Sequence, residues 1–180
     1  MTVSADDVLK FWLDAGTGKW WTKDDGFDAA IRENFATFWQ EASRGDHDQW
    51  KDEPHSALAL VLTLDQFSRN LNRNSALAFS NDSHCCSIVH HALDHGYDQE
   101  CDPEIASFFY LPLMHSESIV DQERCVKLMH ACGQPGGLEA ALEHRDIVSR
   151  FGRFPHRNAV LGRHTSEAEQ AFLDGGGFKG

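Results

Sequence analysis

Apolar residues recur every three or four positions over most of the chain, which is the spacing of an amphipathic α-helix. After Asp24, one helical face carries Phe27, Ile31, Phe35 and Phe38. The segment from Ser56 to about Asn70 is apolar on most sides, which predicts a central, buried helix. No alternating strand pattern of useful length interrupts this periodicity, so we expect an all-α protein.

Capping residues and glycines predict where the other helices begin and end. Ser4, with Asp7 three residues later, has the pattern of a capping box. Further helices are expected over 82–95, from Pro103, over 118–132, over 138–151 and from Thr165 or Ser166, and Pro112 should disrupt the Pro103 helix near its end. Short turns between helix-length segments predict an array of antiparallel helical hairpins, a tetratricopeptide-like α-α superhelix in a single domain over residues 1–180.

Composition restricts the class of protein. The 180 residues fit one domain, and 41% hydrophobic content is ordinary for a globular chain. No apolar run approaches the roughly 18 to 20 residues that cross a bilayer, and the acidic N-terminus is unlike a signal peptide. Five cysteines without a Cys-x-x-Cys pair suggest reduced thiols, so we expect a cytoplasmic protein with no membrane partner. A net charge of -12 argues against a nucleic-acid partner.

Motifs of several common active sites are missing. The sequence has no phosphate-binding loop, no Gly-x-Ser-x-Gly elbow and no His-Glu-x-x-His, and no nucleophile is visibly activated. Four potential metal ligands fall on one predicted helix: Cys86, His90, His91 and His95. The two i,i+4 pairs among them point in different directions, which favours a histidine-rich helix surface. We therefore expect neither a metal nor a cofactor.

A polar stripe ends the apolar helix predicted from Ser56. Asp65 and Arg69 are four residues apart, as are Arg69 and Arg73, so each pair shares a helical face. This stripe predicts either the floor of a pocket or an Asp–Arg clamp between helices.

A second polar group follows Pro112. His115 could act as an acid or base with Glu117 orienting it, and Gln122 and Glu123 follow within two helical turns. The alternative is structural, with Glu117 neutralising one of the arginines between 150 and 157, and this alternative is favoured.

The third group is the segment Phe151–Arg163, where positive charge is concentrated in an otherwise acidic chain. Gly152 and Pro155 bend it, so Arg153, Arg157 and Asn158 could point at one site. Either they form an anion-binding pocket, or they are locked internally by carboxylates, the candidates being Asp65, Glu117, Glu123 and Asp146. Charge alone does not separate these two interpretations.

These three segments, together with Phe11-Trp12 and Phe27-Asp28, resemble the bacterial domain-of-unknown-function family 924 over essentially the whole chain. The longest matching runs are Leu64-Asp65-Gln66-Phe67, Tyr110-Leu111-Pro112 and Phe151 to Asn158, followed by Leu161-Gly162-Arg163. Ser68 and Asn74 depart from the pattern, which usually has proline and glycine there. The resemblance implies an all-helical, tetratricopeptide-like fold, and it transfers no reaction and no catalytic residues.

Two hypotheses about function follow. The first is a domain that binds, or acts on, a small anionic ligand at a pocket of Asp65, Arg69, Arg73, His115, Glu117, Arg153, Arg157 and Asn158. The second is a scaffold that binds a protein partner, in which the arginine-rich segment is a structural polar core. The concentration of arginine, histidine and asparagine favours the first narrowly.

Overall fold

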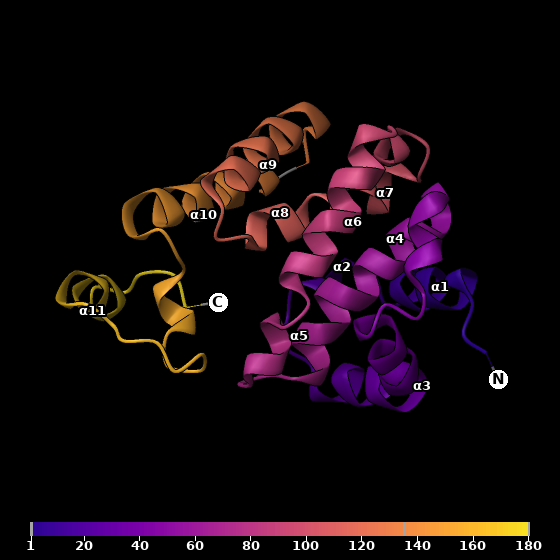
Figure 1. Ribbon diagram of the computed structural model, residues 1–180, viewed down its shortest axis with the longest axis horizontal. Helices are drawn as coiled ribbons and strands as arrows, with labels where there is room; N and C mark the ends of the chain where they lie inside the picture. Colours follow the sequence, from indigo (N-terminus) through magenta and orange to yellow (C-terminus); the bar gives the residue numbers. More distant parts are fainter. Residues whose placement is uncertain (1, 135, 180) are drawn as a thin grey trace. The chain divides into compact units, whose positions relative to one another are not determined.

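The computed structural model describes residues 2–134 and 136–179, and all regular structure in these ranges is helical, without a strand (Figure 1). The predicted all-α class is therefore confirmed, while the stacked, tetratricopeptide-like arrangement stays a prediction. The chain divides into two compact units. Unit 1 comprises Met1–Arg73 and Leu77–Pro112, and unit 2 comprises Asn74–Ala76 and Leu113–Gly180. That the whole chain forms a single domain also remains a prediction.

The helices of unit 1 begin largely where capping residues predict. Ser4 and Asp7 form the expected capping box before the first helix, and Asp24 caps the third through the Phe27 N–H. The elements are α1 (Ala5–Ala15), α2 (Thr17–Trp20), α3 (Asp25–Ser43), a 3-10 turn at Asp48–Asp52, α4 (Pro54–Leu62), a π-helical turn at Thr63–Phe67, α5 (Ser68–Leu71), a 3-10 turn beginning at Ala76, α6 (Asp82–Asp94), a 3-10 turn at Tyr97–Gln99, α7 (Pro103–Ala106) and a 3-10 turn at Ser107–Phe109.

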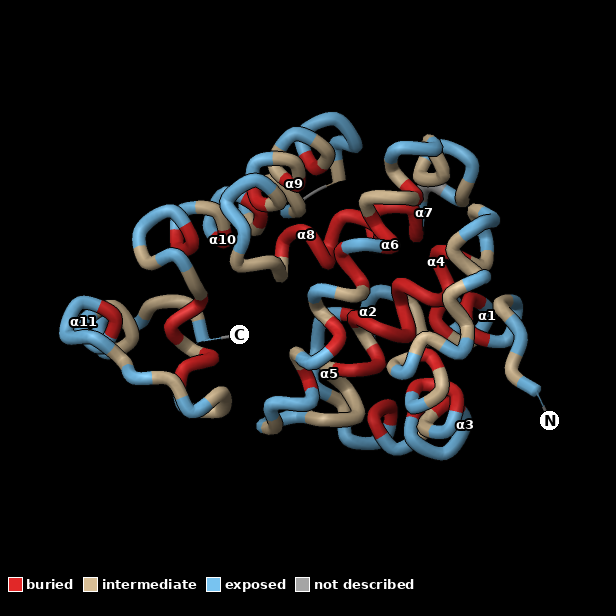
Figure 2. The backbone as a smooth tube through the Cα atoms, viewed as in Figure 1, coloured by how far each residue is buried: buried red, intermediate tan, exposed pale blue. Residues whose placement is uncertain are grey.

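The core of unit 1 is built around α4, as its all-round hydrophobicity predicts (Figure 2). Every residue from Ala57 to Leu62 is buried, and α4 packs on α1 and α6. Aromatic rings fill the rest of the core. Trp12 lies 5.4 Å from Phe108 and 5.9 Å from Phe67, centroid to centroid.

The helix that begins at Pro54 changes to π geometry at Thr63–Phe67, and side chains compensate for the altered backbone bonding. Thr63, Ser68 and Arg69 each donate a hydrogen bond to the carbonyl four residues earlier. Ser68 Oγ also accepts bonds from Trp39 Nε1 at 2.8 Å and Asn81 Nδ2 at 3.2 Å. The hydroxyl at this departure from the family pattern thus ties three elements of unit 1 together.

Unit 2 contains the helical hairpin predicted between Ser118 and Phe151. Helices α9 (Ile119–Cys132) and α10 (Gly137–Phe151) pack along each other, with Ser118 capping the first. A 3-10 turn at Pro155–Arg157 and α11 (Glu167–Asp174) complete the unit. Ser166, with Glu169 as its partner, is the capping residue of α11.

One local expectation is corrected. Pro112 lies in the first turn of a separate short helix, α8 (Leu111–His115), where a proline nitrogen is tolerated because early helical N–H groups have no intrahelical partner. The helix that begins at Pro103 ends before it, at Ala106.

Candidate functional site

The eight residues predicted to form a site belong to both units. Unit 1 contains Asp65, Arg69 and Arg73, and unit 2 contains His115, Glu117, Arg153, Arg157 and Asn158. The surroundings of each set differ, so the two are described separately.

Arg69 lies between two carboxylates in unit 1. Its guanidinium is 3.0 Å from Asp65 Oδ1, as the i,i+4 spacing predicts, and 3.1 Å from Asp82 Oδ1. Asp65 is only 2% exposed. Burial alone would lower the pKa of Arg69, but the charges of Asp65 and Asp82 outweigh it and raise the pKa. Because Asp82 is the first residue of α6, Arg69 connects α5 with α6 through this contact.

Arg73 has a different partner, Asp28 on α3. The Arg73 Nε and one terminal nitrogen donate to the two oxygens of Asp28, and Asn70 Nδ2 donates to Asp28 Oδ1 at 2.7 Å. Burial by itself would raise the pKa of Asp28, but these donors hold the pKa below its ordinary value. Asp28 is therefore a carboxylate that positions both Arg73 and Asn70.

This pair borders a cavity of about 330 Å³ between the N-terminal half of α3 and the residues of α5. Its lining consists of Lys23, Asp25, Asp28, Arg32, Asn70, Leu71 and Arg73. Asp25 is paired with Lys23 at 3.2 Å. Arg32 donates to the carbonyl of Leu71 at 3.2 Å, and no described carboxylate forms an ion pair with it. Three cationic and two anionic side chains thus leave one positive charge at the cavity.

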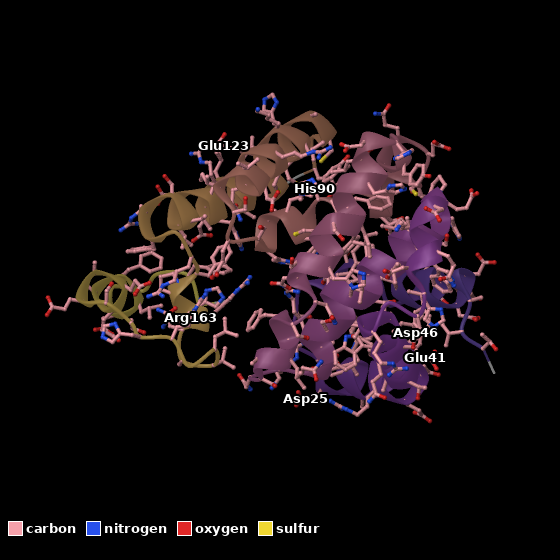
Figure 3. All side chains as sticks on the ribbon, viewed as in Figure 1. Asp25, Glu41, Asp46, His90, Glu123 and Arg163 are labelled. Atoms are coloured by element: carbon pink, nitrogen blue, oxygen red, sulfur yellow. The ribbon has the colours of Figure 1, made fainter. Side chains whose placement is uncertain are left out.

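In unit 2, Arg163, which is labelled in Figure 3, donates to both carboxylate oxygens of Glu117, at 2.7 and 2.9 Å. Glu117 also accepts a hydrogen bond from the Phe154 N–H at 2.8 Å, while Arg163 donates to the Phe154 carbonyl at 3.1 Å. Burial would raise the pKa of Glu117, but the donors outweigh it and the pKa is lowered. The arginine that binds Glu117 is thus Arg163, which lies outside the predicted range 150–157.

Arg153 and Asn158 belong to the same polar network. Arg153 binds Glu169 of α11 through two hydrogen bonds of 2.6 and 2.8 Å and donates to the His164 carbonyl at 2.7 Å. Hydrogen bonding from Arg153 lowers the pKa of Glu169 strongly. Asn158 Oδ1 accepts from Arg163 Nε at 3.1 Å. These contacts fasten α11 and the loop before it to the arginine-rich segment.

The remaining polar side chains pack against aromatic rings. Arg157, 5% exposed, donates to the carbonyl of His115 at 2.9 Å and stacks its guanidinium 4.6 Å from the Phe154 centroid. Burial, aided by the charge of Arg157, lowers the pKa of His156 to about 4, so His156 is neutral near pH 7. Phe178 lies 5.2 Å from the His156 ring.

Several partners in these networks were not among the predicted site residues: Asp28, Asp82, Arg163 and Glu169. Only Glu169 has a local signal, its capping-box position after Ser166. Asp146, one of the candidate carboxylates, forms an exposed contact with Arg150 at 3.5 Å.

In residues 2–134 and 136–179, no three or more His, Cys, Asp or Glu side chains form a group suited to hold a metal ion. None of the described helices is both long and apolar enough to cross a membrane.

Comparison with known proteins places these observations in a family. No curated protein matches the chain. The structure is similar to that of a protein of unknown function from Agrobacterium tumefaciens, ATU0120, with a TM-score of 0.91 and 40% identity, covering 95% of this chain and 97% of the other. The model of the family described as "Bacterial protein of unknown function (DUF924)" matches residues 8–177. The chain therefore belongs to the DUF924 family.

Proposed function

We propose that the protein binds a small anionic ligand in the unit 1 cavity between α3 and α5. The observation that carries this proposal is the cavity's uncompensated positive charge at Arg32, in a chain whose net charge is -12. A volume of about 330 Å³ is large enough for a small metabolite.

The residues have separate roles in this proposal. Arg32 supplies the charge, and the part of its guanidinium that does not bond Leu71 donates to the anion. Arg73 and Lys23 also line the cavity and can donate hydrogen bonds to the anion. They add no net positive charge, because Arg73 is paired with Asp28 and Lys23 with Asp25. A planar carboxylate or a phosphate fits the guanidinium forks best.

Of the eight residues predicted from the sequence to form a site, Arg73 is the one that lines this cavity. We propose that Arg69 is a clamp and that Arg153, Arg157 and Asn158, with Glu117, form the structural polar core considered above. Support comes from their contacts: Arg69, Arg153 and Arg163 meet carboxylates, and Arg157 meets a backbone carbonyl. The scaffold hypothesis stays open for the rest of the surface.

The test is a thermal-shift screen of the full chain against inorganic phosphate, acetate, malonate and citrate at matched ionic strength. A ligand at a hundred times its dissociation constant stabilises the native state by about 2.7 kcal/mol. We expect at least one anion to raise the melting temperature of the native chain, and Arg32→Gln to abolish the rise.

Arg44→Gln is the matched control, because Arg44 follows the same helix at its other end and, among the described acidic groups, pairs with Asp46 alone. It should keep the full shift. An equal shift in Arg32→Gln, or no shift with any of the four anions, would contradict the proposal.

A further inference from the structure

A second cavity in unit 1 contains a carboxylate and, among its described lining residues, no lysine or arginine. It also measures about 330 Å³ and is lined by Thr2, Val3, Asn34, Thr37, Phe38, Glu41 and His47. Glu41 supplies the carboxylate. Asp25 and Glu41, both labelled in Figure 3, stand near opposite ends of α3, the helix that contributes to both cavities.

Several polar atoms that line this cavity can accept hydrogen bonds. Asn34 Nδ2 donates one hydrogen to the Ala30 carbonyl at 2.8 Å, and no described donor engages Oδ1, which can accept. Glu41 uses Oε2 for His47 Nε2 at 3.0 Å, and no described donor engages Oε1. The hydroxyl of Thr37 can also accept. Positions 34, 37 and 41 are spaced by three and four residues, so the three acceptors share one face of α3.

His47 fixes the position of the Glu41 carboxylate. Its ring packs 4.7 Å from Phe38 and 5.6 Å from Trp50, centroid to centroid, and its side chain is only 17% exposed. A packed histidine that donates to one carboxylate oxygen holds the other oxygen in a constant place. Val3 and Phe38 add apolar wall beside the acceptors.

We propose that this cavity binds a primary alkylammonium group. An ammonium has three donors and no acceptor, which matches Asn34 Oδ1, Thr37 Oγ1 and Glu41 Oε1. Its alkyl stem lies against Val3 and Phe38. A bare metal ion fits less well, because one carboxylate and neutral oxygens supply little charge and the volume exceeds what an ion fills.

The test is isothermal titration of the full chain with n-butylammonium chloride, with potassium chloride at equal ionic strength as the reference. Glu41→Gln keeps the shape and removes the charge, and it should weaken butylammonium binding about ten-fold or more. Glu33→Gln, an exposed site on the same helix that does not line the cavity, should leave the affinity unchanged.

A variant expected to bind more tightly is a useful control, because misfolding could explain a loss of binding but not a gain. Asn34→Asp adds a second negative charge beside Glu41 and should tighten butylammonium binding by about three-fold or more. Amide resonances of residues 34–41 should shift on titration of native chain. Absent binding to the native chain, or equal affinity in Glu41→Gln and native protein, would overturn the proposal. Asn34 and Glu41 do not line the cavity that contains Arg32. Anion binding in that cavity is therefore tested independently of butylammonium binding.

Discussion

The two units use arginine in different ways. In unit 2, Arg153, Arg157 and Arg163 all bond backbone carbonyls, and two of them also bind a carboxylate through two hydrogen bonds. These side chains hold Phe151 to Ser166, a segment with little regular helix. These contacts fix the course of the chain in this segment.

In unit 1 the backbone is already helical, and arginine acts between helices. Arg69 joins two buried or half-buried carboxylates, while Arg73 and Arg32 border a cavity. Under the proposed function, the difference teaches that the density of arginine in the sequence does not locate a ligand site. An anion site needs a guanidinium whose charge is left over, and among the residues described around the two cavities Arg32 meets that condition.

The largest expected effect is the loss of the Arg69 clamp. Arg69→Met leaves the carboxylate of Asp65 buried without its counter-charge, and breaking such a pair typically costs about 3 kcal/mol or more. We expect a loss of about 3 kcal/mol in the free energy of unfolding, measured by urea denaturation followed by circular dichroism.

Two measurements make this result specific. Arg44→Met breaks an exposed pair with Asp46 and should cost less than about 1 kcal/mol. Any anion-induced thermal shift should survive in Arg69→Met, since Arg69 does not line the cavity. A stable Arg69→Met variant that no longer responds to anions would reverse the roles assigned to Arg69 and Arg32.

A smaller effect is expected in unit 2 from Glu117→Gln. The variant keeps a hydrogen-bonding group but loses the charge that faces Arg163, which should cost about 1.5 kcal/mol. Because Glu117 also accepts from the Phe154 N–H, amide exchange at Phe154 should accelerate. Glu143→Gln, exposed on α10, is the control and should change neither quantity.

The same pair predicts a pH dependence. The pKa of Glu117 is lowered in the folded state, so its contribution is present above the unfolded pKa of about 4.3 and is lost as pH falls through the folded value. The stability difference between native protein and Glu117→Gln should therefore narrow below about pH 4. A difference that stays constant down to pH 3 would show that the charge of Glu117 contributes nothing to stability.

Local signals explain which features the sequence predicted. The capping boxes at Ser4 and Ser166 satisfy helix N–H groups within three residues, and the left-handed glycines Gly96 and Gly133 follow the ends of α6 and α9. The Asp65–Arg69 contact could also be predicted from the sequence, because side chains four residues apart lie on the same face of a helix.

The remaining contacts depend on how distant segments pack. Arg73 and Asp28 are 45 positions apart, and Arg163 and Glu117 are 46 apart. No periodicity relates such residues. The cavity residue Arg32 had no distinguishing pattern either, since one exposed arginine on an amphipathic helix looks like any other. The role proposed for Arg32 rests on the absence of a carboxylate ion pair with it among the described residues, which only packing reveals.

The smallest effect concerns Asn74, the second departure from the family pattern. Asn74 has a φ of 60°, in the left-handed region where a Cβ is unfavourable and glycine is not penalised. Asparagine tolerates this region better than most residues, and glycine loses more conformational entropy on folding. Both facts reduce the stabilisation gained when glycine relieves the left-handed strain. We expect Asn74→Gly to raise the free energy of unfolding by about 0.5 kcal/mol, measured by urea denaturation.

Ser83→Gly tests whether glycine itself is responsible. Ser83 is exposed in the first turn of α6, where glycine is a poor helix former, so this substitution should lower stability by about 0.5 kcal/mol. Opposite signs at the two positions would show that the left-handed backbone at residue 74 favours the glycine usual in the family. A loss of stability in both variants would instead mean that the Asn74 side chain stabilises this turn more than its backbone conformation costs.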